Sequence, residues 1–175
     1  MIRIILLAVV GLIGLLAIVI AMQPAAFVIE RSAQIQATPS ALYPRIAGPR
    51  AMNQWSPFAL GDSEMKISYS GPDSGVGARS DWESKQMGNG AMTVTEAKQD
   101  QEVTMRLDFL TPMKQTNTAH LVLAPASGGT RVTWRMEGNA GFVGKAFGLL
   151  MNTDKMVGGM FEQGLATMKK QAEGS

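Results

Sequence analysis

The chain has 175 residues, with 16 Lys and Arg against 14 Asp and Glu and a formal net charge of +2. It contains no Cys and one His, which excludes disulfides, thiolate metal sites, a catalytic thiol and a multi-His metal site. The basic residues are scattered rather than gathered into a stripe, so we predict no nucleic-acid binding, no bound metal and no cofactor.

The N-terminal segment is the most apolar part of the chain. Ile4 to Met22 is a run of nineteen residues without a charged or hydrogen-bonding side chain, and Gln23-Pro24 ends it. As a helix this run would be about 28 Å long, close to the bilayer core of about 30 Å. We therefore predict that residues 1–26 form a transmembrane anchor or an uncleaved signal, with residues 4–22 in the membrane. A signal peptide cleaved after Ala21 and a buried helix of a soluble protein are the alternatives.

The basic residues around this segment predict its orientation. Arg3 and the α-amino group precede it, whereas the first basic residue after it is Arg31. The positive-inside rule then favours a cytoplasmic N-terminus, with the following domain on the periplasmic or extracytoplasmic side.

Residues 27–175 carry 15 basic and 14 acidic residues, and their patterns predict one α+β domain. Phe27–Gln36 alternates as a strand does, and Thr38 with Pro39 is typical of a helix start. One-sided alternation then predicts an antiparallel sheet with one covered face. Its expected strands are Met65–Ser70, Ala78–Lys85, Met92–Ala97, Glu102–Thr111, Lys114–Ala124 and Thr130–Gly138.

The period changes near the C-terminus, where we expect helices at Phe142–Asn152 and Asp154–Gln171. Asp154 is the expected cap of the second helix. Gly158, Gly159 and Gly164 weaken that helix intrinsically but would permit its close approach to a sheet.

Several phrases, in this order, resemble the SRPBCC superfamily of START-like, birch-pollen-allergen-like and polyketide cyclase/dehydrase and lipid-transport domains. They are Glu30-Arg31-Ser32, Ala37-Thr38-Pro39-Ser40, Trp55-Ser56-Pro57-Phe58, Gly71 through Ala78 with Trp82, Gly88 through Glu96, Gly129 through Trp134, and Met156 through Leu165. The resemblance covers roughly Phe27 to Lys170 and looks closest to bacterial members with an N-terminal membrane helix. It implies a helix-grip fold, in which an antiparallel sheet wraps around a long C-terminal helix and encloses an apolar cavity. Fold alone does not define a chemistry.

Thirteen Met residues are many for this length, and Met is favoured on adaptable apolar binding surfaces. A small hydrophobic ligand is therefore the expected partner; a filled core without a cavity is the alternative. The candidate lining residues, from the inward strand faces and the long helix, are Trp82, Met92, Met105, Leu107, Phe109, Leu121, Trp134, Met136, Met156 and Met160.

Catalytic patterns are weak by comparison. Ser80, Ser84, Glu96 and His120 are the candidates for polar groups aimed at a cavity. Glu96 shares the parity of Met92 and Val94, but a solvent position at a strand end is the favoured alternative, and His120 shares the outward parity of Val122. No nucleophile motif or paired carboxylates on a helix accompany them. Three functions remain: a membrane-anchored domain that binds a lipid, isoprenoid or polyketide-like molecule; a cyclase or hydrolase that uses the same cavity; and a non-enzymatic envelope domain that binds other proteins.

Overall fold

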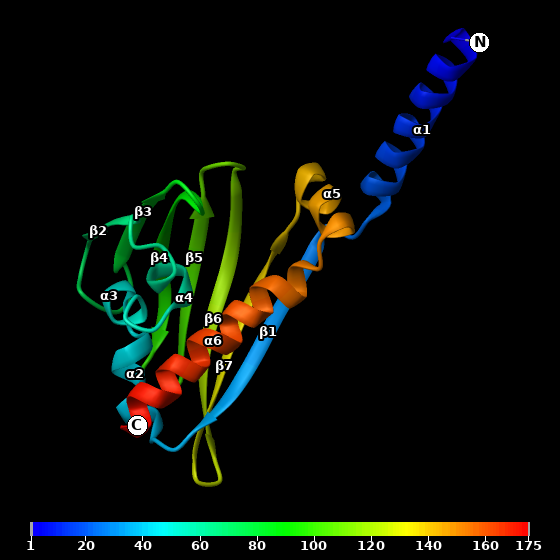
Figure 1. Ribbon diagram of the computed structural model, residues 1–175. Coiled ribbons are helices and arrows are strands. Elements are labelled where there is room, and N and C mark those ends of the chain that lie inside the picture. Colours follow the sequence, from blue (N-terminus) through cyan, green and yellow to red (C-terminus); the bar gives the residue numbers. More distant parts are fainter. Residues whose placement is uncertain (1, 175) are drawn as a thin grey trace.

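A computed structural model of the chain describes residues 2–174 (Figure 1). The helices are α1 (Ile2–Met22), α2 (Pro39–Ile46), α3 (Pro49–Met52), α4 (Pro57–Leu60), α5 (Phe142–Leu150) and α6 (Thr153–Glu173). The strands are β1 (Ala26–Ile35), β2 (Lys66–Ser70), β3 (Arg79–Ser84), β4 (Gly88–Lys98), β5 (Glu102–Phe109), β6 (Gln115–Ala126) and β7 (Gly129–Asn139).

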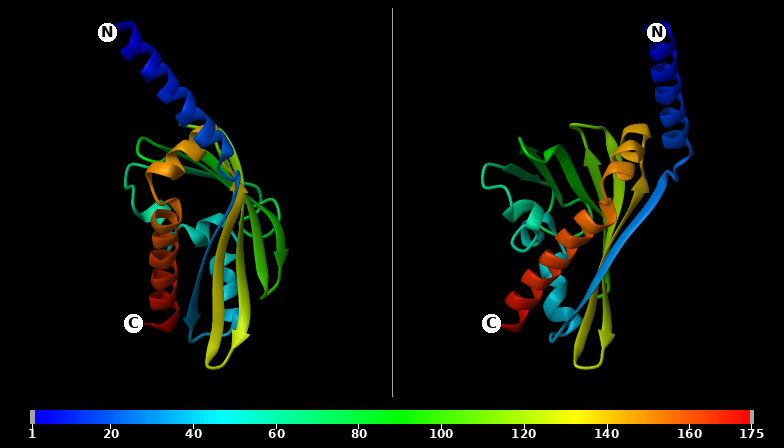
Figure 2. Two further views of the ribbon diagram at one scale, coloured as in Figure 1. Left: turned by 90° about the vertical axis from the view of Figure 1, so that its right-hand side faces the viewer. Right: turned by 45° about the vertical axis from the view of Figure 1, so that its right-hand side comes forward.

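The strands form one antiparallel sheet in the order β1-β7-β6-β5-β4-β3-β2. Strands β2 to β7 follow one another as a meander, and β1 pairs with β7 at the other edge. The long helix α6 lies along one face of this curved sheet (Figure 2). The predicted α+β helix-grip fold is confirmed.

Helix α1 projects away from the sheet (Figure 1). The stretch Ile5–Met22 is long and apolar enough to cross a membrane. Among the side chains of α1 whose burial the structure describes, most of the large ones are exposed and Ile20 is buried. The helix ends at Met22 and β1 begins at Ala26, so only Gln23, Pro24 and Ala25 join them.

Polar and steric contacts fix α6 against the sheet. The guanidinium of Arg31, on β1, donates to Asp154 Oδ2 at 2.9 Å and to Glu162 Oε1 at 2.8 Å. A Cβ at Gly164 would lie 2.8 Å from the ring of Trp134, so this position requires glycine for the helix to pack so closely. The role expected for the helix glycines is thus visible at Gly164.

The start of α6 differs from the prediction. Asn152, rather than Asp154, is the N-cap, and its side chain accepts a hydrogen bond from the Lys155 amide at 2.8 Å. Asp154 lies in the first helical turn, where its carboxylate is engaged by Arg31. By contrast, Thr38 caps α2 as predicted, accepting from the Ala41 amide.

The core is most tightly packed where α2 and the C-terminal half of α6 meet the sheet. We call this region the packed end. Its fully buried apolar side chains include Ile35, Leu42, Ile46, Val103, Leu121, Leu165 and Met168.

A β-bulge interrupts β4. The pairing register with β5 shifts between Val94 and Glu96, because one extra residue, Thr95, is inserted there. The inward parity passes from Val94, which is buried, to Ala97 on the far side of the bulge. Glu96 is therefore exposed and does not point between the sheet and α6.

Candidate functional site

At the other end of the space between the sheet and α6 there is an inner cavity of about 240 Å³. The sheet, the segment that contains α3 and α4, and α6 all contribute to its walls. Its lining consists of Met52, Asn53, Ser56, Phe58, Ala59, Met65, Ile67, Ser80, Trp82, Met87, Met92, Leu107, Phe109, Trp134, Met136, Val157 and Phe161.

Aromatic rings form two walls of the inner cavity. On one side Trp134 stacks on Phe161, with ring centroids 4.3 Å apart and an interplanar angle of 7°. Phe58 meets both rings edge-on. On the other side Trp82 meets Phe109 edge-on at 5.8 Å. These pairs restrain the rings, so the cavity walls are held in shape by aromatic contacts.

The structure brings six of the ten predicted lining residues together around the inner cavity. Four come from the adjacent strands β3, β4 and β5, and Trp134 and Met136 come from β7. The six are Trp82, Met92, Leu107, Phe109, Trp134 and Met136.

The other four predicted residues lie elsewhere. Met105 and Leu121 face inward, but they belong to the packed end and are completely buried there. Met156 is 43% exposed, and Met160 lies outside the lining. The face of α6 that borders the cavity is one position further along the chain and presents Val157 and Phe161.

The sequence interpretation omitted other lining residues. Phe58 belongs to α4 and to the phrase Trp55-Ser56-Pro57-Phe58, whose two aromatic residues were the available signal. Met87 lies in the turn between β3 and β4, where no strand parity applies.

A larger outer cavity of about 700 Å³ adjoins the inner one. Met87, Phe109, Met136 and Val157 line both. The outer cavity is bordered by the connection between α1 and β1, by β1, by the turn between β5 and β6, by α5 and by the start of α6.

Polar groups gather in the outer cavity. Asn117 is only 4% exposed; its Oδ1 accepts from Gln115 Nε2 at 2.8 Å, and its Nδ2 lies 3.8 Å from Met136 Sδ. Asp154 lines the same cavity, and hydrogen bonds from Arg31 lower the pKa of its carboxyl group. The two cavities together thus offer an apolar interior and a more polar outer part.

The inner cavity has few polar groups. Among the described residues, its lining includes no Asp, Glu, His, Lys or Arg. Ser80 contributes a hydroxyl to the wall and is 3% exposed. Ser84 lies outside the lining, and its hydroxyl donates to Asp62 Oδ2 at 2.5 Å and accepts from the Met87 amide.

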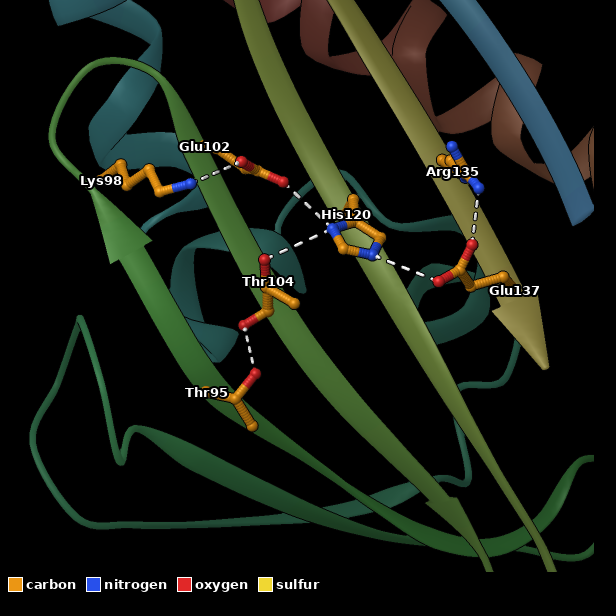
Figure 3. Close-up of polar contacts among 7 residues, drawn as sticks. All are labelled: Thr95, Lys98, Glu102, Thr104, His120, Arg135 and Glu137. Atoms are coloured by element: carbon orange, nitrogen blue, oxygen red, sulfur yellow. Dashed lines mark hydrogen bonds and ion pairs between the residues drawn. The ribbon is translucent and has the colours of Figure 1, made fainter.

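His120 lies on the outer face of the sheet, away from the cavities (Figure 3). Its Nδ1 is 3.0 Å from Glu102 Oε1 and 3.3 Å from Thr104 Oγ1, and Nε2 is 3.9 Å from Glu137 Oε1. Partial burial would raise the pKa of Glu102, but hydrogen bonds from His120 and Lys98 lower it overall. The outward parity predicted for His120 is confirmed. The only histidine of the chain therefore lines neither the inner nor the outer cavity.

Comparisons with known proteins agree with this geometry. A family model described as polyketide cyclase / dehydrase and lipid transport matches residues 26–173. The comparison with curated proteins finds no match to this chain.

Solved structures share the fold. Protein CV1439 from Chromobacterium violaceum is 17% identical, with a TM-score of 0.58 over 83% of this chain and 96% of that one. Ara h 8.0201 is 10% identical, with a TM-score of 0.59 over 86% of this chain and 99% of that one. DynU16, a protein of the dynemicin biosynthetic locus, is 12% identical, with a TM-score of 0.58 over 83% of this chain and 47% of that one. At these identities the likeness concerns the fold alone.

Proposed function

The chain belongs to the polyketide cyclase / dehydrase and lipid transport family, and from this membership and the cavity geometry we propose that it is a membrane-anchored domain that binds a small apolar or amphipathic molecule between the sheet and α6. In this proposal residues 1–26 anchor the chain and residues 27–175 form the binding domain. The ligand is of the lipid, isoprenoid or polyketide-like class.

The observation that carries the proposal is the apolar inner cavity. Ligand sites are usually concave, mostly apolar and equipped with a few polar groups, with volumes of about 300–1,000 Å³. The inner cavity, at about 240 Å³, is slightly smaller, but it adjoins an outer cavity of about 700 Å³. An elongated ligand would fit with its apolar part among Trp82, Leu107 and Trp134 and its polar end near Asn117.

Gln23 and Pro24, which directly follow α1, line the outer cavity. If α1 spans a bilayer, the outer cavity lies beside that bilayer, where apolar molecules concentrate. The basic residues around α1 favour the extracytoplasmic side for the domain.

The lining supports binding more strongly than catalysis. General acid–base chemistry needs a titratable group within hydrogen-bond reach of the reacting atoms. Of the four polar candidates, only Ser80 borders the inner cavity, and within the described part of the chain no charged or imidazole side chain lines it. A cyclase or hydrolase would have to draw on Asp154 or Lys145 in the outer cavity.

Native mass spectrometry of the full chain, extracted from its own membrane, tests the proposal. We expect a co-purifying small molecule. We also expect a photoreactive fatty acid to label peptides of the cavity wall, and to be displaced by excess unlabelled fatty acid.

Two methionine variants provide the matched pair. Met92→Trp places a large ring in the inner cavity and should abolish both signals, whereas Met156→Trp alters an exposed side chain and should leave them unchanged. Equal behaviour of the two variants, or a protein without bound molecule and without displaceable labelling, would refute ligand binding in this cavity.

A further inference from the structure

Helix α5 is an apolar helix whose side chains are largely uncovered. Its nine residues include one charged residue, Lys145, and none of them is buried. Leu150 is 86% exposed, and the other exposed apolar side chains of α5 and the residue after it are Phe142, Val143, Phe147, Leu149 and Met151. Contiguous exposed apolar surface of this kind marks a contact site on a soluble domain.

The position of α5 indicates what covers this surface. The helix packs beside the end of α1, and Lys145 Nζ donates to the carbonyl oxygen of Ala21 at 3.1 Å. Ala21 belongs to the last turn of the apolar span, so α5 lies at the level where the span ends. A lysine with an apolar stem and a charged end is suited to the boundary between acyl chains and headgroups.

A second element reaches the same level. The turn between β5 and β6 carries the exposed residues Leu110, Met113 and Lys114, and it lies at the end of the sheet from which α1 emerges (Figure 1). Met113 and Phe147 both line the outer cavity, so the turn and α5 flank its mouth.

We propose that α5 and the β5–β6 turn insert into the interfacial layer of the membrane that α1 spans, so that the mouth of the outer cavity opens onto the bilayer. Interfacial helices bury their apolar side chains in the headgroup and acyl boundary. The bilayer is favoured over a second copy of the chain because the apolar surface is continuous with α1. The inference rests on the proposed membrane anchor, and it adds the route by which a ligand would enter.

Single cysteines test the inference, because the chain has none of its own. Leu150→Cys and Met113→Cys, each labelled with the fluorophore NBD, are reconstituted as the full chain in vesicles of phosphatidylcholine and phosphatidylglycerol. We expect blue-shifted emission and quenching by a lipid that carries a nitroxide near its headgroup. Labelled Ser127→Cys, in the turn at the opposite end of the sheet, should show neither.

A label at Leu12→Cys, within α1, separates the two possible failures. If Leu12→Cys is quenched by lipid nitroxides but Leu150→Cys and Met113→Cys behave like Ser127→Cys, the interfacial contact is refuted and the anchor stands. If Leu12→Cys is not quenched either, the anchor fails, and the inference with it. Shielding that increases with protein density without lipid quenching would identify a second copy as the occupant and also refute the inference.

The route makes a separate prediction. In the double variant Phe142→Glu/Val143→Glu, at two exposed residues of α5 outside the cavity lining, the photoreactive fatty acid should label the cavity several-fold more slowly from vesicles, and at an unchanged rate from detergent micelles. Ser127→Glu is the control. Equal rates from vesicles in the double variant and the wild type would overturn the proposed entry route.

Discussion

The two ends of the space between the sheet and α6 are built from similar side chains but differ in how they are filled. At the packed end, Met105, Leu121 and Leu165 are completely buried. At the other end, which we call the hollow end, Met92, Leu107 and Met136 border a cavity. Apart from Leu165, which belongs to α6, both sets lie on inward strand positions, and Met105 and Leu107 are neighbours on the same face of β5.

The difference is in what covers the sheet. Over the packed end lie α2 and the C-terminal half of α6, which bring Leu42, Ile46 and Met168 into contact with it. Over the hollow end the cover is the segment that contains α3 and α4, together with the first half of α6, which the ion pairs of Arg31 hold to β1. Strand parity therefore determines which side chains point inward. The covering helices determine whether those side chains are packed against other side chains or border a cavity.

Two leucine truncations should give the largest contrast between the ends. Leu121→Ala leaves a cavity in close-packed surroundings and should lower the free energy of unfolding by about 2–5 kcal/mol. Leu107→Ala only enlarges an existing cavity, so it should cost less, about 1 kcal/mol. Urea denaturation of the full chain in detergent measures both. Equal losses would contradict the division into a packed and a hollow end.

Two glycines of α6 test how closely the helix is fitted where it crosses Trp134. Gly164→Ala places a Cβ 2.8 Å from the Trp134 ring and 2.9 Å from Pro57, so we expect a loss of about 1–3 kcal/mol. A Cβ at Gly159 meets nothing within 4 Å, so Gly159→Ala should stabilise by up to about 1 kcal/mol through helix propensity. Urea denaturation should show a lower free energy of unfolding for Gly164→Ala and a higher one for Gly159→Ala. A higher free energy of unfolding for Gly164→Ala would mean that α6 packs loosely against Trp134.

Acid should weaken the hollow end through Asp154. Hydrogen bonds from Arg31 hold the pKa of Asp154 below its ordinary value of 3.8. The ion pair therefore stabilises the fold above pH 3.8, and its contribution is lost as the pH falls below that value. Asp154→Asn should lower the melting temperature slightly at neutral pH, because the pair is solvent-exposed.

The difference in melting temperature between Asp154→Asn and the wild type should shrink as the pH is lowered. Asp73→Asn is the control, because Asp73 pairs with Arg50 only at 3.6 Å and its side chain is 94% exposed, so this variant should match the wild type throughout. A difference between Asp154→Asn and the wild type that persists in acid would show that the ion pair is not its source.

The smallest effect is expected at Leu150, outside both ends. Its side chain is 86% exposed, so Leu150→Ser in detergent should change the free energy of unfolding by no more than about 0.5 kcal/mol. A larger loss would show that α5 packs on the domain and is not a free apolar surface.

The sequence predicted the fold well because each signal is local. Period-two alternation identified the strands, and Thr38 with Pro39 marked the start of α2, which the structure confirms. The resemblance to the SRPBCC superfamily supplied the arrangement of these elements, which alternation alone does not determine.

The errors arise where a neighbour overrides a local signal. Asp154 is a good capping residue, but Asn152 lies two positions earlier and Arg31 engages the carboxylate of Asp154. That contact depends on a strand 123 residues away in the chain, and no local pattern encodes it. Glu96 lies in solvent as expected, but the reason is a bulge that no local pattern encodes, because Thr95 inserts into β4 and reverses the parity of Glu96.

The cavity was the least predictable feature. A cavity is space that side chains leave empty, and an inward Met that fills the core has the same local pattern as an inward Met that borders a void. Met105 and Met92 illustrate this, because both are inward residues of central strands and only Met92 borders the inner cavity.

The short connection between α1 and β1 limits how far the domain can travel. Three residues join Met22 to Ala26, and at full extension this connection spans about 14 Å. With α1 in a bilayer, the domain stays at the surface of that bilayer and cannot cross an aqueous space to a second membrane. Cargo taken up there would have to leave by the same membrane or pass to a separate, mobile carrier.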